Sequence, residues 1–369
     1  MKFLNLDRQS EVVKAAIQER FNRIIRASDF ILGDDVFEME EALAEFTGSR
    51  FCISCSSGTD ALLMSLMALD VKAGDEVITT SFSFFSTVEV VLRLGATPVF
   101  VDIDPSSGNL NADLVREACS DKTKAIIAVN LYGNLCDYSA LLEICRDENV
   151  WLVEDAAQSF GAWDSVLDRA SCSLGHISCT SFFPAKPLGC FGDGGAIFTD
   201  DGDLARKLKA IRVHGQEERY NHHTLGIGGR MDTMQAAVII EKLARFPEEL
   251  SRRQFIVDSY DSVLQSFNIK RASGKLGDRS ANALYTILPE QRQVLIEQLK
   301  KVDIPFAVHY PTSMPDQVLF EGRFKNLKIP FARSMSQTCI SLPVDPYFFD
   351  VEIDEICARL GDCFRVLEW

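Results

Sequence analysis

The sequence predicts an α/β protein built around a largely parallel central sheet. The first observation is a series of seven short runs that are β-branched or almost continuously hydrophobic, at 51–54, 76–80, 98–102, 124–129, 150–154, 177–181 and 195–199. Strands that are covered on both faces have this composition. The second observation is that helix-like segments separate most of these runs, at 60–68, 86–94, 111–118 and 138–149. Alternating strands and helices favour a mostly parallel sheet of seven strands.

The segments on either side of this region predict the rest of the architecture. The first 21 residues, MKFLNLDRQSEVVKAAIQERF, predict a polar strand that leads into an amphipathic helix. Beyond residue 200 we expect helices at 204–213, 232–267 (interrupted near Pro247), 292–302 and 351–366, a loop at 214–229 and a strand at 283–288. This change of pattern predicts a large domain of residues 1–245, with an N-terminal arm and helix, and a smaller α+β domain of residues 246–369.

Composition and charge exclude several classes of partner. The chain has 369 residues, of which 47% are hydrophobic and 25% charged, and its formal net charge is −15. Such a charge repels nucleic acid and anionic membranes, although an anionic small molecule could bind where a few basic side chains converge. We find no signal peptide, transit peptide or membrane-spanning run, so we expect a cytoplasmic protein.

Eleven cysteines without a secretory signal indicate reduced, buried thiols rather than a disulfide framework. Cys52 and Cys55 have the spacing of a redox pair, and Cys172, His176 and Cys179 could be imagined as metal ligands. Both groups lie in predicted strands, and neither has a second motif or a regular ligand spacing. Core packing is therefore favoured, and we predict no metal site.

Polar residues follow four of the predicted strands, in the segments SSGTDA, SFSFFST, EDAAQS and SFFPAK. Because ligands of open parallel sheets gather at the carboxyl ends of the strands, we expect these segments to form the site. In SSGTDA, small residues precede a helix whose free N–H groups favour an anion such as phosphate. An ordinary N-cap explains this segment equally well. The segment is not a P-loop, and neither GIGG nor GDGG is a Rossmann fingerprint.

Asp155 and Lys186 follow the fifth and sixth strands and suggest the chemistry. A carboxylate at the end of a buried strand is costly unless it meets a cation or a strong donor, although Asp155 could also be a simple cap. Lys186 lies in FFPAKP, where apolar neighbours can desolvate its amine and flanking prolines restrict the backbone. Most lysines are solvated. An anion cup, a strand-end Asp and a loop Lys together are what a Schiff-base cofactor such as pyridoxal 5′-phosphate (PLP) needs.

Several motifs resemble, in order, the DegT/DnrJ/EryC1/StrS family of nucleotide-sugar aminotransferases: ILGDDVFEMEEALAEFTG, SCSSGTDALL, GATPVFVDID, LVEDAAQSFGA, SFFPAKPLGCFGDGGAI and RMDTMQAA. The resemblance runs from about residue 2 to the C-terminus. It implies an aspartate aminotransferase-like fold, PLP or its amine form PMP (pyridoxamine phosphate) as the cofactor, and a homodimer. SFFPAKPLGCFGDGGAIFT looks most like the enzymes that aminate UDP-2-acetamido-2-deoxy-3-oxo-D-glucuronate.

The resemblance assigns a role to each matching residue. Lys186 becomes the Schiff-base lysine and proton shuttle, and Asp155 the partner of the pyridine nitrogen. Gln158 becomes the donor to the phenolic oxygen of the cofactor. Gly58, Thr59 and Ser181 match the phosphate-binding positions. Phe84 matches an aromatic residue that stacks on the ring, although core packing would explain Phe84 equally well.

Substrate-side positions are implied in two further motifs. Arg230 matches an arginine that could grip the sugar carboxylate or diphosphate, and His309 and Tyr310 in AVHYP match contacts of the sugar-uronate enzymes. The sequence departs from the family at Gly228, where an asparagine often reaches the phosphate of the partner subunit's cofactor. Either another group holds that phosphate, or cofactor affinity is reduced.

The resemblance therefore implies amino transfer from an amino acid, L-glutamate, to a keto nucleotide sugar, which would supply an amino sugar for polysaccharides such as the lipopolysaccharide O-antigen. Three alternatives remain open. A PLP-dependent sugar dehydratase usually lacks the lysine that this chain has at position 186. A regulatory or ligand-binding protein could use the same fold without catalysis. A nicotinamide-dependent dehydrogenase would need the absent G-x-G-x-x-G motif.

Overall fold

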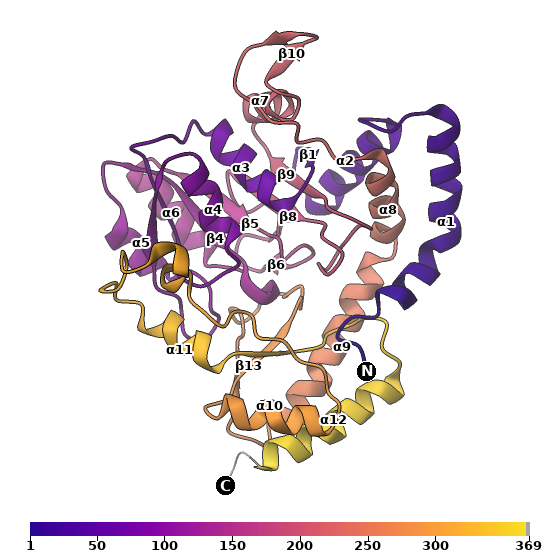
Figure 1. Cartoon of the computed structure of the whole chain (residues 1–369), viewed down its shortest axis with the longest axis vertical. Coiled ribbons are helices and arrows are strands. Elements are labelled where there is room, and N and C mark those ends of the chain that lie inside the picture. Colours follow the sequence, from indigo (N-terminus) through magenta and orange to yellow (C-terminus); the bar gives the residue numbers. More distant parts are fainter. Residues whose placement is uncertain (367–369) are drawn as a thin grey trace.

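The computed structural model describes residues 1–366 and has a seven-stranded sheet at its centre (Figure 1). The strand order is β1-β9-β8-β5-β4-β2-β3. In chain order these strands are β1 (Phe51–Cys55), β2 (Glu76–Thr80), β3 (Thr97–Val101), β4 (Thr123–Val129), β5 (Trp151–Asp155), β8 (Ile177–Ser181) and β9 (Gly195–Thr199). β9 pairs antiparallel with β1 and β8, whereas the other pairs are parallel. The predicted seven strands and mostly parallel sheet are confirmed.

Helices cover both faces of the sheet, which explains why its strands are apolar throughout. One face packs against α3 (Gly58–Ala68), α4 (Ser86–Arg93) and α7 (Gly202–Arg212), with side chains such as Leu62, Val90 and Leu208 in its core. The other face packs against α2 (Asp34–Thr47), α5 (Ala112–Ala118), α6 (Tyr138–Glu148) and α8 (Thr233–Leu243). Helix α1 (Leu6–Ala27) lies along α8 (Figure 1).

Two sequence-based expectations for connecting segments are wrong. Residues 1–5 do not form a strand and pair with none of the sheets. Instead, the Asn5 backbone N–H donates to the Asp345 carboxylate, and α1 begins one residue later. The expected loop at 214–229 contains a small hairpin, β10 (Gln216–Glu218) and β11 (Asn221–His222), which projects beyond α7 (Figure 1).

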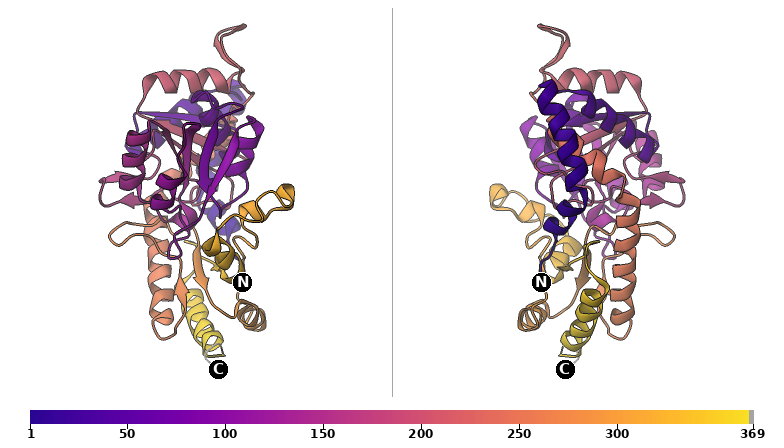
Figure 2. Two further views of the ribbon diagram at one scale, coloured as in Figure 1. Left: turned by 90° about the vertical axis from the view of Figure 1, so that its left-hand side faces the viewer. Right: turned by 90° about the vertical axis from the view of Figure 1, so that its right-hand side faces the viewer.

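The C-terminal part has its own hydrophobic core. It contains α9 (Phe246–Leu264), α10 (Arg292–Lys301), α11 (Pro330–Thr338), α12 (Asp350–Arg365) and a three-stranded sheet of β12 (Lys270–Arg271), β13 (Tyr285–Leu288) and β14 (Ile340–Leu342). Apolar side chains from α9, α10, α12, β13 and β14 form one cluster, and Figure 2 shows α12 at the opposite end of the molecule from the β10–β11 hairpin. We propose that residues 246–369, of which 367–369 lie outside the described residues, form a separate smaller domain, because the long helical stretch breaks between α8 and α9.

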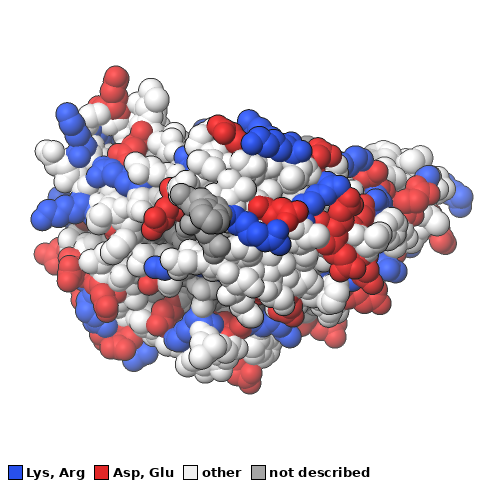
Figure 3. Space-filling model, turned by 90° about the horizontal axis from the view of Figure 1, so that it is seen from below, with Lys and Arg blue, Asp and Glu red and all other residues white. Residues whose placement is uncertain are grey.

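Charged side chains of both signs are interspersed on the face that Figure 3 shows, and no patch of one sign dominates that face. Among the residues that the structure describes, no helix combines the length and the apolar character that crossing a membrane requires.

A buried ion pair joins α2 to α7 beside β1. Arg212 and Glu40 are 5% and 8% exposed, and Nη1 of Arg212 lies 2.5 Å from Oε1 of Glu40. The same carboxylate oxygen accepts hydrogen bonds from the backbone N–H and hydroxyl of Ser54, at 2.8 and 2.7 Å. The pair therefore fixes α2 and α7 on the strand that leads into SSGTDA.

We expect Arg212→Met to lower the free energy of unfolding by about 3–5 kcal/mol, because it leaves the Glu40 carboxylate buried without its cation. Urea denaturation measures this loss. Arg206→Met on the same helix is the control, since its ion pair with Asp203 is exposed and should contribute less than about 1 kcal/mol. Equal effects of the two substitutions would contradict a structural role for the buried pair.

Candidate functional site

A cavity of about 600 Å³ opens at the carboxyl ends of the parallel strands. Residues that follow β1, β2, β5 and β8 line it, together with residues 3–4, 283–284 and 307–310. The four strand-end segments meet here because parallel strands end at the same edge of the sheet. A volume of this size is typical of sites for small molecules and cofactors.

Lys186 lies in a tight turn on the wall of this cavity. Its backbone N–H donates to the Phe183 carbonyl oxygen at 2.9 Å, which closes a turn immediately after β8. Burial lowers the pKa of the Lys186 amine below its usual value of 10.5, and the negative charge of Asp155 partly opposes this shift. A larger fraction of the amine is therefore neutral near pH 8 than for an exposed lysine, as a nucleophile requires.

Asp155, the last residue of β5, is 5% exposed and also lines the cavity. Its Oδ1 accepts from the Ala157 backbone N–H and its Oδ2 from the Thr87 hydroxyl, both at 3.2 Å. Burial raises the pKa of this carboxyl above 3.8, while the Ala157 N–H, Lys186 and Thr87 lower it. The two hydrogen bonds fix a carboxylate on the cavity floor that can pair with a positive group.

The segment Ser57-Gly58-Thr59 forms a cup at the N-terminus of α3. Ser57 is the N-cap, and its hydroxyl accepts from the Asp60 backbone N–H at 3.0 Å. A Cβ atom added to Gly58 would lie 2.6 Å from the Cβ of Ser181, so only glycine allows these two segments to approach so closely. Ser57 therefore caps the helix, while Gly58 and Thr59 line the cavity, where an anion cup remains a prediction.

Aromatic and polar side chains form the opposite wall. Gln158 accepts from the Tyr132 backbone N–H at 2.7 Å and donates from Nε2 to the Tyr310 hydroxyl at 3.2 Å. Phe84 is 57% exposed in the cavity, so the core-packing reading of Phe84 is wrong; its neighbour Phe82 is the buried one. The ring centroid of Phe84 lies 6.3 Å from that of Tyr310.

His309 completes this wall. Its Nδ1 lies 3.0 Å from the Ser341 hydroxyl, and its backbone carbonyl oxygen accepts from the Tyr132 hydroxyl. Burial lowers the pKa of its imidazole, and the nearby Lys186 lowers it further, so His309 is neutral near pH 7. A neutral imidazole can orient a polar ligand but adds no positive charge to the site.

The structure brings nine of the ten predicted site residues to this cavity: Gly58, Thr59, Phe84, Asp155, Gln158, Ser181, Lys186, His309 and Tyr310. Arg230 does not line it. The backbone carbonyl oxygen of the preceding Gly229 accepts from the Ser56 N–H at 3.0 Å, which places Arg230 beside the cup segment. A Cβ atom added to Gly228 would lie 3.1 Å from the imidazole of His214 and 3.4 Å from the guanidinium of Arg230.

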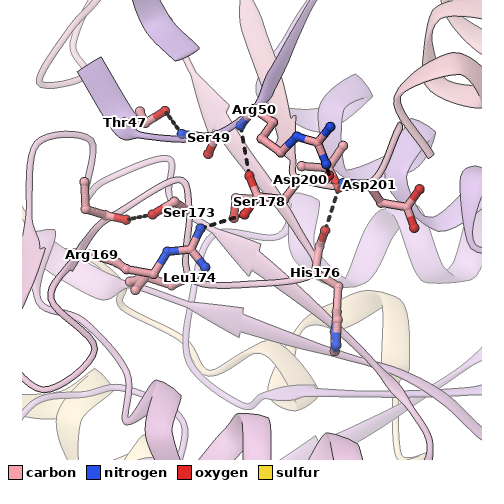
Figure 4. Close-up of polar contacts among 12 residues, drawn as sticks. Thr47, Ser49, Arg50, Arg169, Ser173, Leu174, His176, Ser178, Asp200 and Asp201 are labelled. Carbon is pink, nitrogen blue, oxygen red and sulfur yellow. Dashed lines mark hydrogen bonds and ion pairs between the residues drawn. The ribbon is translucent and has the colours of Figure 1, made fainter. Parts of the chain in front are cut away.

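The surroundings of Cys52 and Cys55, and of Cys172, His176 and Cys179, favour packing over redox chemistry or metal binding. Burial raises the pKa of both the Cys52 and Cys55 thiols, which disfavours the thiolate that redox chemistry needs. Nδ1 of His176 accepts from the Leu152 backbone N–H at 2.9 Å. The carbonyl oxygen of His176 accepts from the Thr199 hydroxyl at 2.9 Å. Figure 4 shows His176 among residues that form local polar contacts. Residues 1–366 contain no cluster of three or more His, Cys, Asp or Glu suited to a metal.

Several lining residues have no signal in the sequence. Phe3 and Leu4 reach the cavity from the N-terminal segment, and Ala283 and Leu284 reach it from the segment before β13. Thr87, which does not line the cavity but donates to Asp155, could have been predicted, because SFSFFST follows a strand and the Thr87 hydroxyl can reach a neighbouring strand end. The other four are apolar residues in segments without a motif, so only the tertiary structure reveals them.

The sequence matches the DegT/DnrJ/EryC1/StrS aminotransferase family over residues 11–361. The chain belongs to this family. An aminotransferase of Pseudomonas aeruginosa named UDP-2-acetamido-2-deoxy-3-oxo-D-glucuronate aminotransferase is 42% identical over 360 residues, which are 98% of this chain and 99% of that protein. A protein of Geobacillus stearothermophilus named pleiotropic regulatory protein is 36% identical over 371 residues, with 98% of each chain covered.

Solved structures agree with this assignment. The crystal structure of NtdA from Bacillus subtilis with bound PMP has a TM-score of 0.90 and 27% identity to this aminotransferase, and the match covers 99% of this chain and 85% of that one. The expected PLP-aminotransferase fold is confirmed. The expected enzyme class, a PLP-dependent nucleotide-sugar aminotransferase, is confirmed too.

The cavity of this aminotransferase fits PLP. The α3 N-terminus, kept open by Gly58 against Ser181, can take the phosphate. The Lys186 amine, whose pKa is lowered, can take the aldehyde. The anchored Asp155 carboxylate can hold the protonated ring nitrogen. Together these three features match the three ends of one PLP molecule.

Proposed function

We propose that the protein transfers the amino group of L-glutamate to UDP-2-acetamido-2-deoxy-3-oxo-D-glucuronate. The observation that carries the proposal is the meeting of Lys186, Asp155 and the Gly58–Thr59 cup in one cavity. The 42% identity to the P. aeruginosa enzyme over almost the whole chain supports this particular sugar. Sugar amination as a class follows from the family.

The residues of the chain have separate tasks in this proposal. PLP, when bound, supplies an electron sink that stabilises the negative charge left when the α-proton of a substrate is removed. The Lys186 amine would move that proton between the substrate carbon and C4′ of the cofactor. An amine whose pKa is lowered can act as such a base. Asp155 keeps the ring nitrogen protonated, the α3 N-terminus holds the phosphate, and Gln158 orients the ring through its amide.

The described side chains of the cavity contain few positive charges for so anionic a substrate. Lys186 and the neutral His309 are the basic groups among the lining residues of the described chain. We therefore propose that the enzyme works as a homodimer. We also propose that Arg230, which does not line the cavity within one chain, grips the carboxylate or diphosphate of the sugar. Light scattering of the purified protein tests the dimer.

A half-reaction assay tests the proposed function. Protein reconstituted with PLP should be yellow, and L-glutamate should bleach its visible band while 2-oxoglutarate forms. The 3-keto UDP-uronate should restore the band and yield the 3-amino sugar at a kcat/KM at least about tenfold above that of dTDP- and GDP-keto sugars, a difference of about 1.4 kcal/mol. Preference for another keto sugar would overturn the substrate assignment and leave the amino transfer standing.

The same assay separates the remaining alternatives. The G. stearothermophilus relative named as a regulatory protein is the observation that favours a non-catalytic role. A protein that binds PLP or the sugar but is not bleached by any amino acid would support that role. A sugar dehydratase would release water from the sugar without consuming glutamate, which mass spectrometry of the products detects.

A further inference from the structure

A second lysine, outside the cavity, contacts the loop that carries Lys186. Lys242 lies in the last turn of α8 and is 1% exposed. Its amine donates to the backbone carbonyl oxygen of Gly189 and to the side-chain oxygen of Gln9 in α1, the latter at 2.8 Å. An amine so fully buried is costly unless its hydrogen bonds are satisfied. These contacts therefore link α1, α8 and the Lys186 loop at one buried atom.

The loop formed by residues 182–190 is too compact for its two ends to move separately. The Cys190 backbone N–H donates to the Phe182 carbonyl oxygen at 2.7 Å, which closes the loop. A Cβ atom added to Gly189 would lie 2.6 Å from the Phe183 carbonyl oxygen and 2.8 Å from that of Pro184. Because Lys186 donates to the same Phe183 carbonyl, a displacement of Gly189 would be passed on to the turn that presents the amine.

Lys242 lies near a buried group of charges that influences its amine. Burial lowers its pKa to about 8, and the negative charge of Glu249 in α9 opposes that shift. Glu249 in turn accepts from the Tyr347 hydroxyl at 2.6 Å, and Oε2 of Glu249 has no hydrogen-bond partner among the described residues. The Arg253 guanidinium, which donates to the Val344 carbonyl oxygen at 2.7 Å, supplies a second positive charge. The charges of Glu249 and Arg253 therefore influence the Lys242 amine, while its hydrogen bonds are those to Gly189 and Gln9.

We propose that Lys242 is a positioning residue, which holds the 182–190 loop through the Gly189 carbonyl and thereby keeps the Lys186 amine in the cavity beside Asp155. The inference deepens the proposed function and rests on the role assigned there to Lys186. Loss of the Lys242 donor leaves the Gly189 carbonyl buried and unpaired, so the loop must shift toward water. Lys186 would then be better solvated, and its amine would titrate closer to 10.5.

The test measures the titration of Lys186 in the protein without cofactor. Acetic anhydride, a small neutral reagent, acetylates neutral amines, and mass spectrometry of the Lys186 peptide gives the acetylation rate at each pH. In Lys242→Met we expect the midpoint of this rate profile to rise by about one pH unit, because desolvation shifts lysine pKa values by such amounts. With cofactor, kcat should fall about tenfold while the KM of the keto sugar changes less than twofold.

Two further variants make the result decisive. Lys207→Met on α7 is the matched control, because the Lys207 ion pair with Asp70 lies on the surface and should leave both the Lys186 midpoint and kcat unchanged. If Lys242→Met does not fold, as judged by circular dichroism, Lys242→Met/Glu249→Gln removes the charge left unbalanced and is measured instead. A folded variant with an unchanged Lys186 midpoint overturns the positioning role.

A separate measurement on the wild-type enzyme keeps the two proposals apart. Borohydride reduction of the PLP-loaded protein followed by peptide mapping shows which lysine carries the cofactor. Attachment elsewhere than Lys186 would overturn the proposed function. The acetylation midpoint would still decide whether Lys242 positions the loop, because that measurement needs neither cofactor nor substrate.

Discussion

Lys186→Ala should lower kcat for amino transfer by at least about a thousandfold, within the range that general acid–base groups contribute. Among the described residues, Lys186 is the cavity-lining lysine; it lies in a turn, and burial shifts its amine toward the neutral form. Alanine removes both the attachment point of the cofactor and the proton carrier. The half-reaction with L-glutamate, followed by stopped-flow absorbance, measures the loss.

The fold should survive this substitution, because Lys186 lies on the wall of an open cavity and its backbone hydrogen bond is retained. Lys301→Ala, on the exposed end of α10, is the control and should behave as wild type. Added methylamine or ethylamine should restore part of the activity, since either fits the space that the side chain vacates. Turnover above a tenth of the wild-type rate would show that Lys186 is not the proton carrier.

Much of the site could be predicted because of one property of parallel sheets. Their strands are apolar and easily found, and their carboxyl ends lie at the same edge. Asp155 and Lys186 are 31 positions apart in the sequence, yet Asp155 ends β5 and Lys186 follows the neighbouring β8, so both line the same cavity. Polar residues directly after buried strands needed no tertiary information beyond this rule.

The parts that could not be predicted depend on packing between distant segments. Phe3 reaches the cavity because the segment before α1 is held by Asp345, which is 340 positions away from Asn5. Lys242 looks in the sequence like an ordinary lysine near a helix C-terminus, where a positive charge is favourable in any case. Arg230 was assigned from a family motif, and motif position does not determine whether a side chain reaches the cavity of its own chain.

Burial shifts the pKa values of Asp155 and Lys186 in opposite directions. Burial raises the pKa of the carboxyl and lowers the pKa of the amine, so desolvation drives both toward the neutral form. Their mutual attraction acts against burial in both cases. Burial and mutual attraction thus act in opposite directions on each group, and such perturbed titratable groups are typical of functional sites.

The second large effect should come from Asp155→Asn, which we expect to lower kcat about a hundredfold or more. The change keeps the size of the side chain, and its amide oxygen can still accept from the Ala157 N–H while its NH₂ group donates to Thr87. What disappears is the negative charge that would keep the ring nitrogen of the cofactor protonated. Steady-state kinetics and the affinity for PLP measure the change.

The pH profile distinguishes this loss of charge from damage to the fold. Because burial raises the pKa of Asp155, wild-type activity should fall on the acid side at a pH above the 3.8 of an exposed aspartate, as the carboxylate gains a proton. Asp155→Asn has no such proton to gain, so its lower activity should lack that acid limb.

The control is Glu154→Gln. Glu154 occupies the adjacent position of β5, is fully buried, and accepts hydrogen bonds from Ser178, Ser171 and other donors. It should lose stability and keep the acid limb. An unchanged limb in Asp155→Asn would mean that another group controls the protonation state of the ring.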